Sequence, residues 1–106
     1  MKTIAGTGVR QGQITCTQNS WVALTAVNNN RMFIHIQNVG AGTVYLYQGV
    51  AAPAAIDGSV AFRCLKPAGA GQAYTEWVSG DSHAQFRGKI WALAIGAQST
   101  AQVGEW

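Results

Sequence analysis

Few residues of this chain could carry out catalysis, and they are scattered along the sequence. The acidic residues are Asp57, Glu76, Asp81 and Glu105. Only the segment Asp81-Ser82-His83 brings together the residue types of a catalytic triad, in which a histidine takes the proton of a serine hydroxyl. Neighbours in one short loop rarely hold that geometry, and no Gly-x-Ser-x-Gly elbow is present. We therefore interpret the segment as a solvated turn and expect that the protein is not an enzyme.

The sequence gives little support for a metal or phosphate site. A metal site needs three or four ligands that converge, but the two histidines, His35 and His83, are far apart in the chain. The glycine pairs at 6–8, 40–42 and 69–71 lack the continuation of a phosphate-binding loop and are more typical of turns. We expect no metal ion and no cofactor.

The charge of the chain is low and evenly spread. Only 10% of its 106 residues are charged, against about 25% in an average soluble protein. The net charge of +3 comes from basic residues that stand singly, so the sequence has no basic stripe for nucleic acid. No apolar run reaches the roughly 18 residues of a membrane span, and no membrane partner is expected. A surface so poor in charge favours a permanent assembly.

The length and the cysteines indicate a single small domain. A chain of 106 residues has room for one core. Residues 1–13 are glycine-containing and nearly free of large apolar side chains, so we expect a flexible N-terminal arm followed by one domain at 14–106. Cys16 and Cys64 are too few for a disulfide framework, and two buried thiols are favoured over a bridge.

The elements that position these residues are strands. In the segment 32–38, Met32, Ile34 and Ile36 fall on one face and His35 on the other, which predicts a strand on which His35 is a half-buried packing or interface residue. Similar alternation predicts strands near 9–17, 21–26, 43–48, 59–65, 72–78, 87–95 and 100–105. The prediction is all-β: an antiparallel sandwich or jelly roll of about eight short strands. Residues 49–58 are expected to form a long loop between the sheets, with further loops at 66–71 and 79–83.

The aromatic residues offer the most interesting candidate surface. Tyr45 and Tyr47 share the face opposite Val44 and Leu46, and aromatic rings on an outward sheet face suit a sugar platform or a protein interface. A sandwich core could absorb the same residues. We expect Trp21, Phe62 and Ile90 in the core and leave Tyr45, Tyr47, Trp77 and Trp106 open.

Several segments resemble a pattern found in small structural proteins of tailed bacteriophages. The segment 31–40, RMFIHIQNVG, followed by TVYLYQG at 43–49, is similar to their pattern of Arg, apolar alternation, Gln-Asn, a short turn and a second strand ending near Gly. The segment 65–69, LKPAG, looks like their Leu-x-Pro-Gly bend with Ala68 inserted. The segments 88–92 and 102–105 look like the two strands that follow. The likeness covers residues 31–106 in outline.

The resemblance implies a head decoration or cement protein, a β-sandwich on the outer surface of the virion that bridges subunits of the major capsid protein. It also implies a homo-oligomer, with a trimer ahead of a dimer. Contacts are expected on the arm, on the 49–58 loop and on a 79–86 loop. The candidate contact residues are Lys2, Arg10, Tyr45, Tyr47, Asp57, Trp77, Asp81, His83 and Phe86. The competing interpretation is a carbohydrate-binding module, or a tail-fibre or receptor-binding piece, that stacks a glycan on Trp77 or Tyr47.

Overall fold

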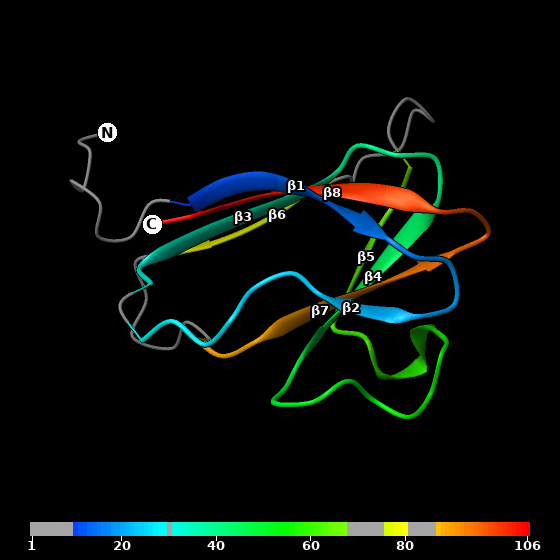
Figure 1. Cartoon of the computed structure of the whole chain (residues 1–106), viewed down its shortest axis with the longest axis horizontal. Helices are drawn as coiled ribbons and strands as arrows, with labels where there is room; N and C mark the ends of the chain where they lie inside the picture. Colours follow the sequence, from blue (N-terminus) through cyan, green and yellow to red (C-terminus); the bar gives the residue numbers. More distant parts are fainter. Residues whose placement is uncertain (1–9, 30, 68–75, 81–86) are drawn as a thin grey trace.

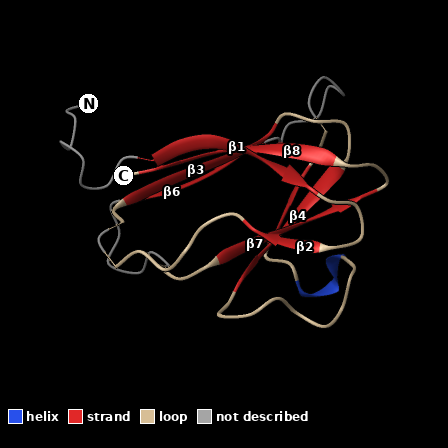
Figure 2. Ribbon diagram, in the orientation of Figure 1, coloured by secondary structure: helices blue, strands red, loops and turns tan. Residues whose placement is uncertain are grey.

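The chain folds into two antiparallel four-stranded sheets that face each other, as the computed structural model shows (Figures 1 and 2). The structure describes residues 10–29, 31–67, 76–80 and 87–106. Sheet A has the order β1-β8-β3-β6 and sheet B the order β2-β7-β4-β5. The strands are β1 (Arg10–Cys16), β2 (Trp21–Ala23), β3 (Phe33–Asn38), β4 (Thr43–Gln48), β5 (Arg63–Leu65), β6 (Glu76–Gly80), β7 (Ile90–Ile95) and β8 (Ser99–Glu105). This strand order is a jelly roll, which confirms the predicted fold class.

The core lies between the sheets and follows the alternation of the strands. In β3 and β4, every second residue is buried and its neighbours are half-buried, because successive side chains of a strand point to opposite faces. Fully buried apolar side chains from both sheets meet in the middle, among them Ile34, Ile36, Val44, Leu46 and Ile90. Cys16 belongs to this core, and burial raises the pKa of its thiol to about 11.

Both cysteines are free thiols, as expected, and the register shows why they do not meet. The side chain of Cys16 joins the core between the sheets. Cys64 pairs with Tyr45 across β5 and β4, and its neighbour Leu65 pairs with the core residue Val44. The Cys64 side chain therefore lies on the outer face of sheet B. The thiol of Cys64 is half-buried, whereas two fully buried thiols were predicted.

The buried side chain of Asn38 bonds the turn between β3 and β4 to the end of β5 and the start of β8. The side-chain amide of Asn38 donates to the carbonyl oxygens of Gly42, Leu65 and Lys66 at 2.8–3.1 Å. Its side-chain oxygen accepts from the backbone of Gly40 and from the hydroxyl of Ser99. The glycines of this turn are there for space, since a Cβ on Gly42 would lie 1.9 Å from the carbonyl oxygen of Ala97.

Several predicted boundaries shift for identifiable reasons. The strand predicted at 21–26 ends at Ala23, because the backbone N–H of Ile90 donates to the hydroxyl of Thr25 at 3.1 Å and not to a backbone carbonyl oxygen of a continuing strand. The strand predicted at 59–65 starts only at Arg63, because Asp57 caps a short 3-10 turn at Gly58–Val60. Residues 79 and 80, predicted as loop, belong to β6.

The predicted arm at 1–13 is also too long at its C-terminal end. Residues 10–13 pair with residues 105–102 of β8, so their backbone is held in sheet A. The strand predicted near 9–17 overlaps the predicted arm, and the structure favours the strand at residues 10–13, because polar and glycine residues can form a strand when their backbone has a partner. Residues 1–9 lie outside the described part of the chain.

Candidate functional site: a pinned loop on the outer face of sheet B

Residues 49–62, which we call the β4–β5 loop, fold back over the outer face of sheet B (Figure 1). The indole N–H of Trp91 donates to the carbonyl oxygen of Gly49 at 3.0 Å, and that of Trp21 donates to the carbonyl oxygen of Ala55 at 2.7 Å. A Cβ on Gly58 would lie 2.4 Å from the ring of Tyr45, so the loop touches this ring closely. The loop joins two strands of the same sheet, which corrects the prediction that it crosses between the sheets.

The aromatic face that the sequence predicted therefore lies beneath this loop. The pairing of strands brings Trp21, Leu93 and Tyr45 side by side across β2, β7 and β4. The rings of Trp21 and Tyr47 are 5.9 Å apart. Leu93 has no exposed surface although it points away from the sandwich core. These residues form a second, smaller apolar cluster, and Tyr45 and Tyr47 are half-buried members of it.

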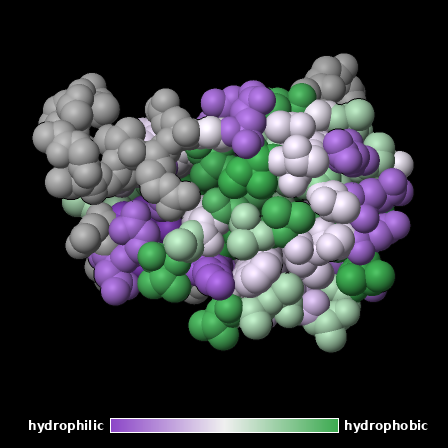
Figure 3. Space-filling model, viewed as in Figure 1, coloured by the Kyte–Doolittle hydropathy of each residue, from purple (hydrophilic) through white to green (hydrophobic). Residues whose placement is uncertain are grey.

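The outward surface of the β4–β5 loop is apolar and carries no basic residue. Val50, Ile56 and Val60 are 86%, 56% and 42% exposed. Figure 3 shows hydrophobic residues along the lower margin of the molecule, where this loop runs. Asp57 is exposed on the same loop, and hydrogen bonds from Ser59 lower the pKa of its carboxyl group. The loop thus presents aliphatic side chains on a backbone that the indoles hold in place.

A shallow cavity of about 230 Å³ lies at one end of this cluster, between Tyr45, Gly58 and the first residues of β5. The pKa of the Tyr45 hydroxyl is raised, mainly by the nearby thiol of Cys64 and to a smaller extent by burial. The structure thus brings Tyr45 and Asp57, two predicted contact residues, into one neighbourhood. A raised pKa makes the Tyr45 hydroxyl a weaker nucleophile, so the geometry supports a packing role for its ring.

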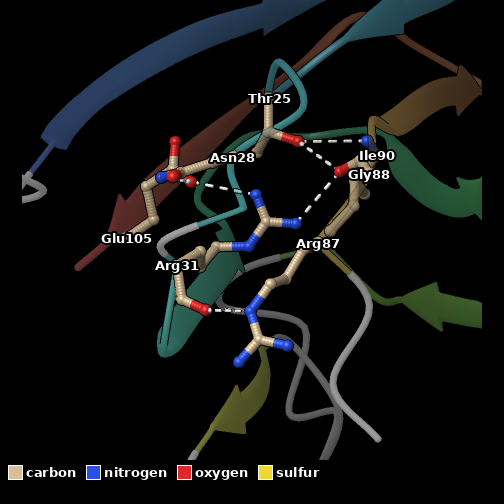
Figure 4. Close-up of polar contacts among 7 residues, drawn as sticks. All are labelled: Thr25, Asn28, Arg31, Arg87, Gly88, Ile90 and Glu105. Atoms are coloured by element: carbon tan, nitrogen blue, oxygen red, sulfur yellow. Dashed lines mark hydrogen bonds and ion pairs between the residues drawn. The ribbon is translucent and has the colours of Figure 1, made fainter.

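Within the described ranges, Arg31 and Glu105 form a buried ion pair that the sequence did not predict (Figure 4). The Nη1 atom of Arg31 lies 2.9 Å from Oε1 of Glu105, and neither side chain has any exposed surface. Arg31 also donates to the carbonyl oxygen of Gly88 at 3.0 Å, and Arg87 donates from Nε to the carbonyl oxygen of Arg31 at 2.8 Å. The amide of Asn28 donates to Glu105 at 3.3 Å.

This cluster ties the ends of three segments together, and the charged groups of Arg31 and Glu105 within it have no exposed surface. It joins the chain before β3, the end of β8 and the chain before β7. A sequence signal existed: Glu105 continues the alternation of the buried residues Ala101 and Val103, which places a carboxylate at a core position. A buried carboxylate requires a partner, and the partner is Arg31.

Those predicted contact residues that the structure describes do not all gather at one place. Arg10 lies in β1, and its backbone pairs with that of Glu105. Trp77 packs against the core, with its ring 5.0 Å from that of Phe62. The predictions for Lys2, Asp81, His83 and Phe86 concern residues outside the described part of the chain. Of the three residues predicted in the core, Ile90 is fully buried and Phe62 packs against the core. Trp21 instead lies under the β4–β5 loop, where its indole donates to that loop.

Within the described ranges, no group of three or more His, Cys, Asp or Glu residues is placed to hold a metal ion. Likewise, the part of the chain that the structure describes contains no helix long and apolar enough to cross a membrane. Comparison of the chain with known protein families, with curated proteins and with solved structures found no match.

Proposed function

We propose that this protein is a capsid decoration protein of a tailed bacteriophage that binds the major capsid protein through its β4–β5 loop. The observation that carries the proposal is the pinned loop with three exposed aliphatic side chains, Val50, Ile56 and Val60. The likeness of residues 31–106 to small phage structural proteins supports the choice of partner. Jelly rolls occur among viral capsid domains, which adds support by analogy of fold only.

The physics of such a contact favours this loop. A loop already held by the indoles of Trp21 and Trp91 loses little conformational freedom when it binds. Burying an exposed aliphatic side chain contributes about 1.5–3 kcal/mol. A domain that bridges two capsid subunits adds a contact that must break before those subunits separate, and mass action increases the stabilisation with concentration.

The experiment is co-sedimentation of the pure protein with undecorated heads assembled from the partner major capsid protein. The double variant Val50→Ser/Ile56→Ser should bind at least about tenfold more weakly, because it removes two apolar contacts. Val78→Ser is the matched control, since Val78 is 46% exposed on β6 in the other sheet. Equal binding by the loop variant and the control would assign the contact elsewhere, and no co-sedimentation of the unchanged protein would refute the proposal.

We also propose that the protein forms a symmetric homo-oligomer, with a trimer ahead of a dimer. Its low content of charged residues, 10%, supports self-association. Light scattering coupled to size exclusion should give a mass near three times the 11.2 kDa of one chain. A mass of one chain at high micromolar concentration would contradict this expectation.

A further inference from the structure

The outer face of sheet A carries a row of three amide side chains on β1, β8 and β3 that ends at the carboxylate of Glu76 on β6. The strand register places Gln13 opposite Gln102, Gln102 opposite Gln37, and Gln37 opposite Glu76. The amide of Gln13 donates to the side-chain oxygen of Gln102 at 3.3 Å. These residues alternate with buried core residues along their strands, so they point away from the sandwich core. We call this surface the amide face.

The described part of the amide face carries few charged groups. Beside the row, Nε2 of His35 lies 2.8 Å from Oε1 of Glu76, with side chains 27% and 54% exposed. No lysine occurs in β1, β3, β6 or β8. Among the outward positions whose side chains the structure describes, Glu76 is the one acidic residue and Val78 is an exposed apolar one, so these positions hold no cluster of like charge.

An aromatic pair lies at one end of the same face. Phe33 lies on the same face of β3 as His35 and Gln37. The centroids of the Phe33 and Trp106 rings are 4.9 Å apart, and the ring planes are inclined by 44°. The backbone holds this pair, because Phe33 donates to the carbonyl oxygen of Trp106 at 2.8 Å and accepts from its N–H at 3.0 Å. Gln37 lies four positions along β3 from Phe33, a distance of about 13 Å.

We propose that the amide face binds a neutral polysaccharide. An amide side chain both donates and accepts hydrogen bonds, and a sugar hydroxyl does the same. The apolar C–H faces of a sugar ring pack on aromatic rings, which Phe33 and Trp106 supply at one end. A flat row along a sheet suits an extended chain of sugars. A nucleic acid or an acidic polymer would instead require clustered basic residues.

This site differs from the glycan site that the sequence suggested. Tyr47 lies under the β4–β5 loop, and Trp77 packs against the core, so neither offers a free ring for stacking. The amide face and the β4–β5 loop lie on opposite sides of the sandwich, with both sheets between them (Figure 1). A domain held to a surface by the loop would present its amide face away from that surface. The glycan proposal does not depend on the capsid proposal.

The test is native gel electrophoresis of the full chain in gels that contain hydroxyethyl cellulose, galactomannan or dextran, with alginate and heparin as acidic polymers. We expect at least one neutral polymer to retard the protein. The variant Gln37→Ala/Gln102→Ala should weaken that binding roughly tenfold, since each lost hydrogen bond contributes about 0.5–1.5 kcal/mol. The matched control is Gln98→Ala, because Gln98 is exposed in the turn between β7 and β8.

Each outcome decides the question. Retardation that the double variant loses and the control retains supports the proposal. The single variant Gln102→Glu, which keeps the size of the side chain and removes its donor, should lose affinity as well, and circular dichroism checks that each variant is folded. The proposal is overturned by retardation in acidic polymers alone, by equal binding of the double variant and the control, or by no retardation in any gel.

Discussion

Replacing Glu105 by Gln would remove one charge from an ion pair that has no exposed surface. Nη1 of Arg31 and Oε1 of Glu105 are 2.9 Å apart, and both side chains are fully buried. The variant leaves the Arg31 charge in the interior with its carboxylate partner gone. Breaking a buried pair in this way costs about 3–5 kcal/mol. This is a large share of the roughly 5–15 kcal/mol that stabilises a small domain.

The same fold contains a matched control at the surface. His35 and Glu76 are 2.8 Å apart, but their side chains are 27% and 54% exposed. An exposed pair contributes only about 0–1 kcal/mol, because water solvates its charges in the folded and the unfolded chain. The two pairs have nearly the same separation but differ in burial, and His35 carries a charge only when it is protonated.

The assay is thermal and urea unfolding, followed by tryptophan fluorescence and circular dichroism. For a chain of 106 residues, an unfolding entropy of about 2.1 cal/mol/K per residue converts 1 kcal/mol into roughly 4.5 °C of Tm. Glu105→Gln should therefore lower Tm by about 13–22 °C, and Glu76→Gln by less than about 5 °C. The double variant Arg31→Met/Glu105→Leu should lose less than Glu105→Gln, because no charge stays buried without its counterion. Equal shifts for Glu105→Gln and Glu76→Gln would refute the argument from burial.

Other predictions test the turn and the thiols. Asn38→Asp should lower the free energy of unfolding by about 3–5 kcal/mol, measured by urea titration, since a carboxylate would face three carbonyl oxygens. Gly42→Ala should lower it by about 1–3 kcal/mol, because the added Cβ would meet backbone atoms. In the native protein, Ellman's reagent should titrate Cys64 quickly and Cys16 only on unfolding, and equal rates would contradict the assigned burial. Burial raises the pKa of the Cys16 thiol from 9.0 to about 11 in the folded protein. The contribution of the buried, protonated thiol to stability is therefore complete below pH 9 and is lost as pH rises to 11. Wild type should therefore lose roughly 2 kcal/mol more than Cys16→Ala over that interval, and parallel pH profiles would show that the thiol does not contribute.

The sequence predicts strands well where alternation is complete, and less well where a side chain replaces a backbone bond. Residues 43–48 alternate throughout, and the predicted strand coincides with β4. The strand predicted at 21–26 fails after Ala23, because the Thr25 hydroxyl substitutes for a backbone carbonyl. No periodicity contains that information, since it depends on the position of Ile90, 65 residues further along the chain.

The aromatic residues show a different limit of sequence reasoning. Alternation correctly separates Tyr45 and Tyr47 from the core residues Val44 and Leu46. It does not reveal that the β4–β5 loop covers that outward face. A signal was present in the loop itself, since the segment 50–56, VAAPAAI, is entirely apolar. An apolar loop of this length is expected to bury part of its surface, and here it does so against the indoles of Trp21 and Trp91.

The surface carries even fewer charges than the composition suggests, because one acidic and one basic side chain are buried. The chain has seven basic and four acidic residues, and the buried pair of Arg31 and Glu105 takes one of each, which leaves six and three for the rest of the molecule. Hydration of the outer face of sheet A then depends on amide and hydroxyl groups, and the β4–β5 loop exposes aliphatic groups. Partners of such surfaces are selected by hydrogen bonding and apolar contact more than by charge. Binding at either surface should therefore change little between low and physiological salt, in contrast to binding by basic patches.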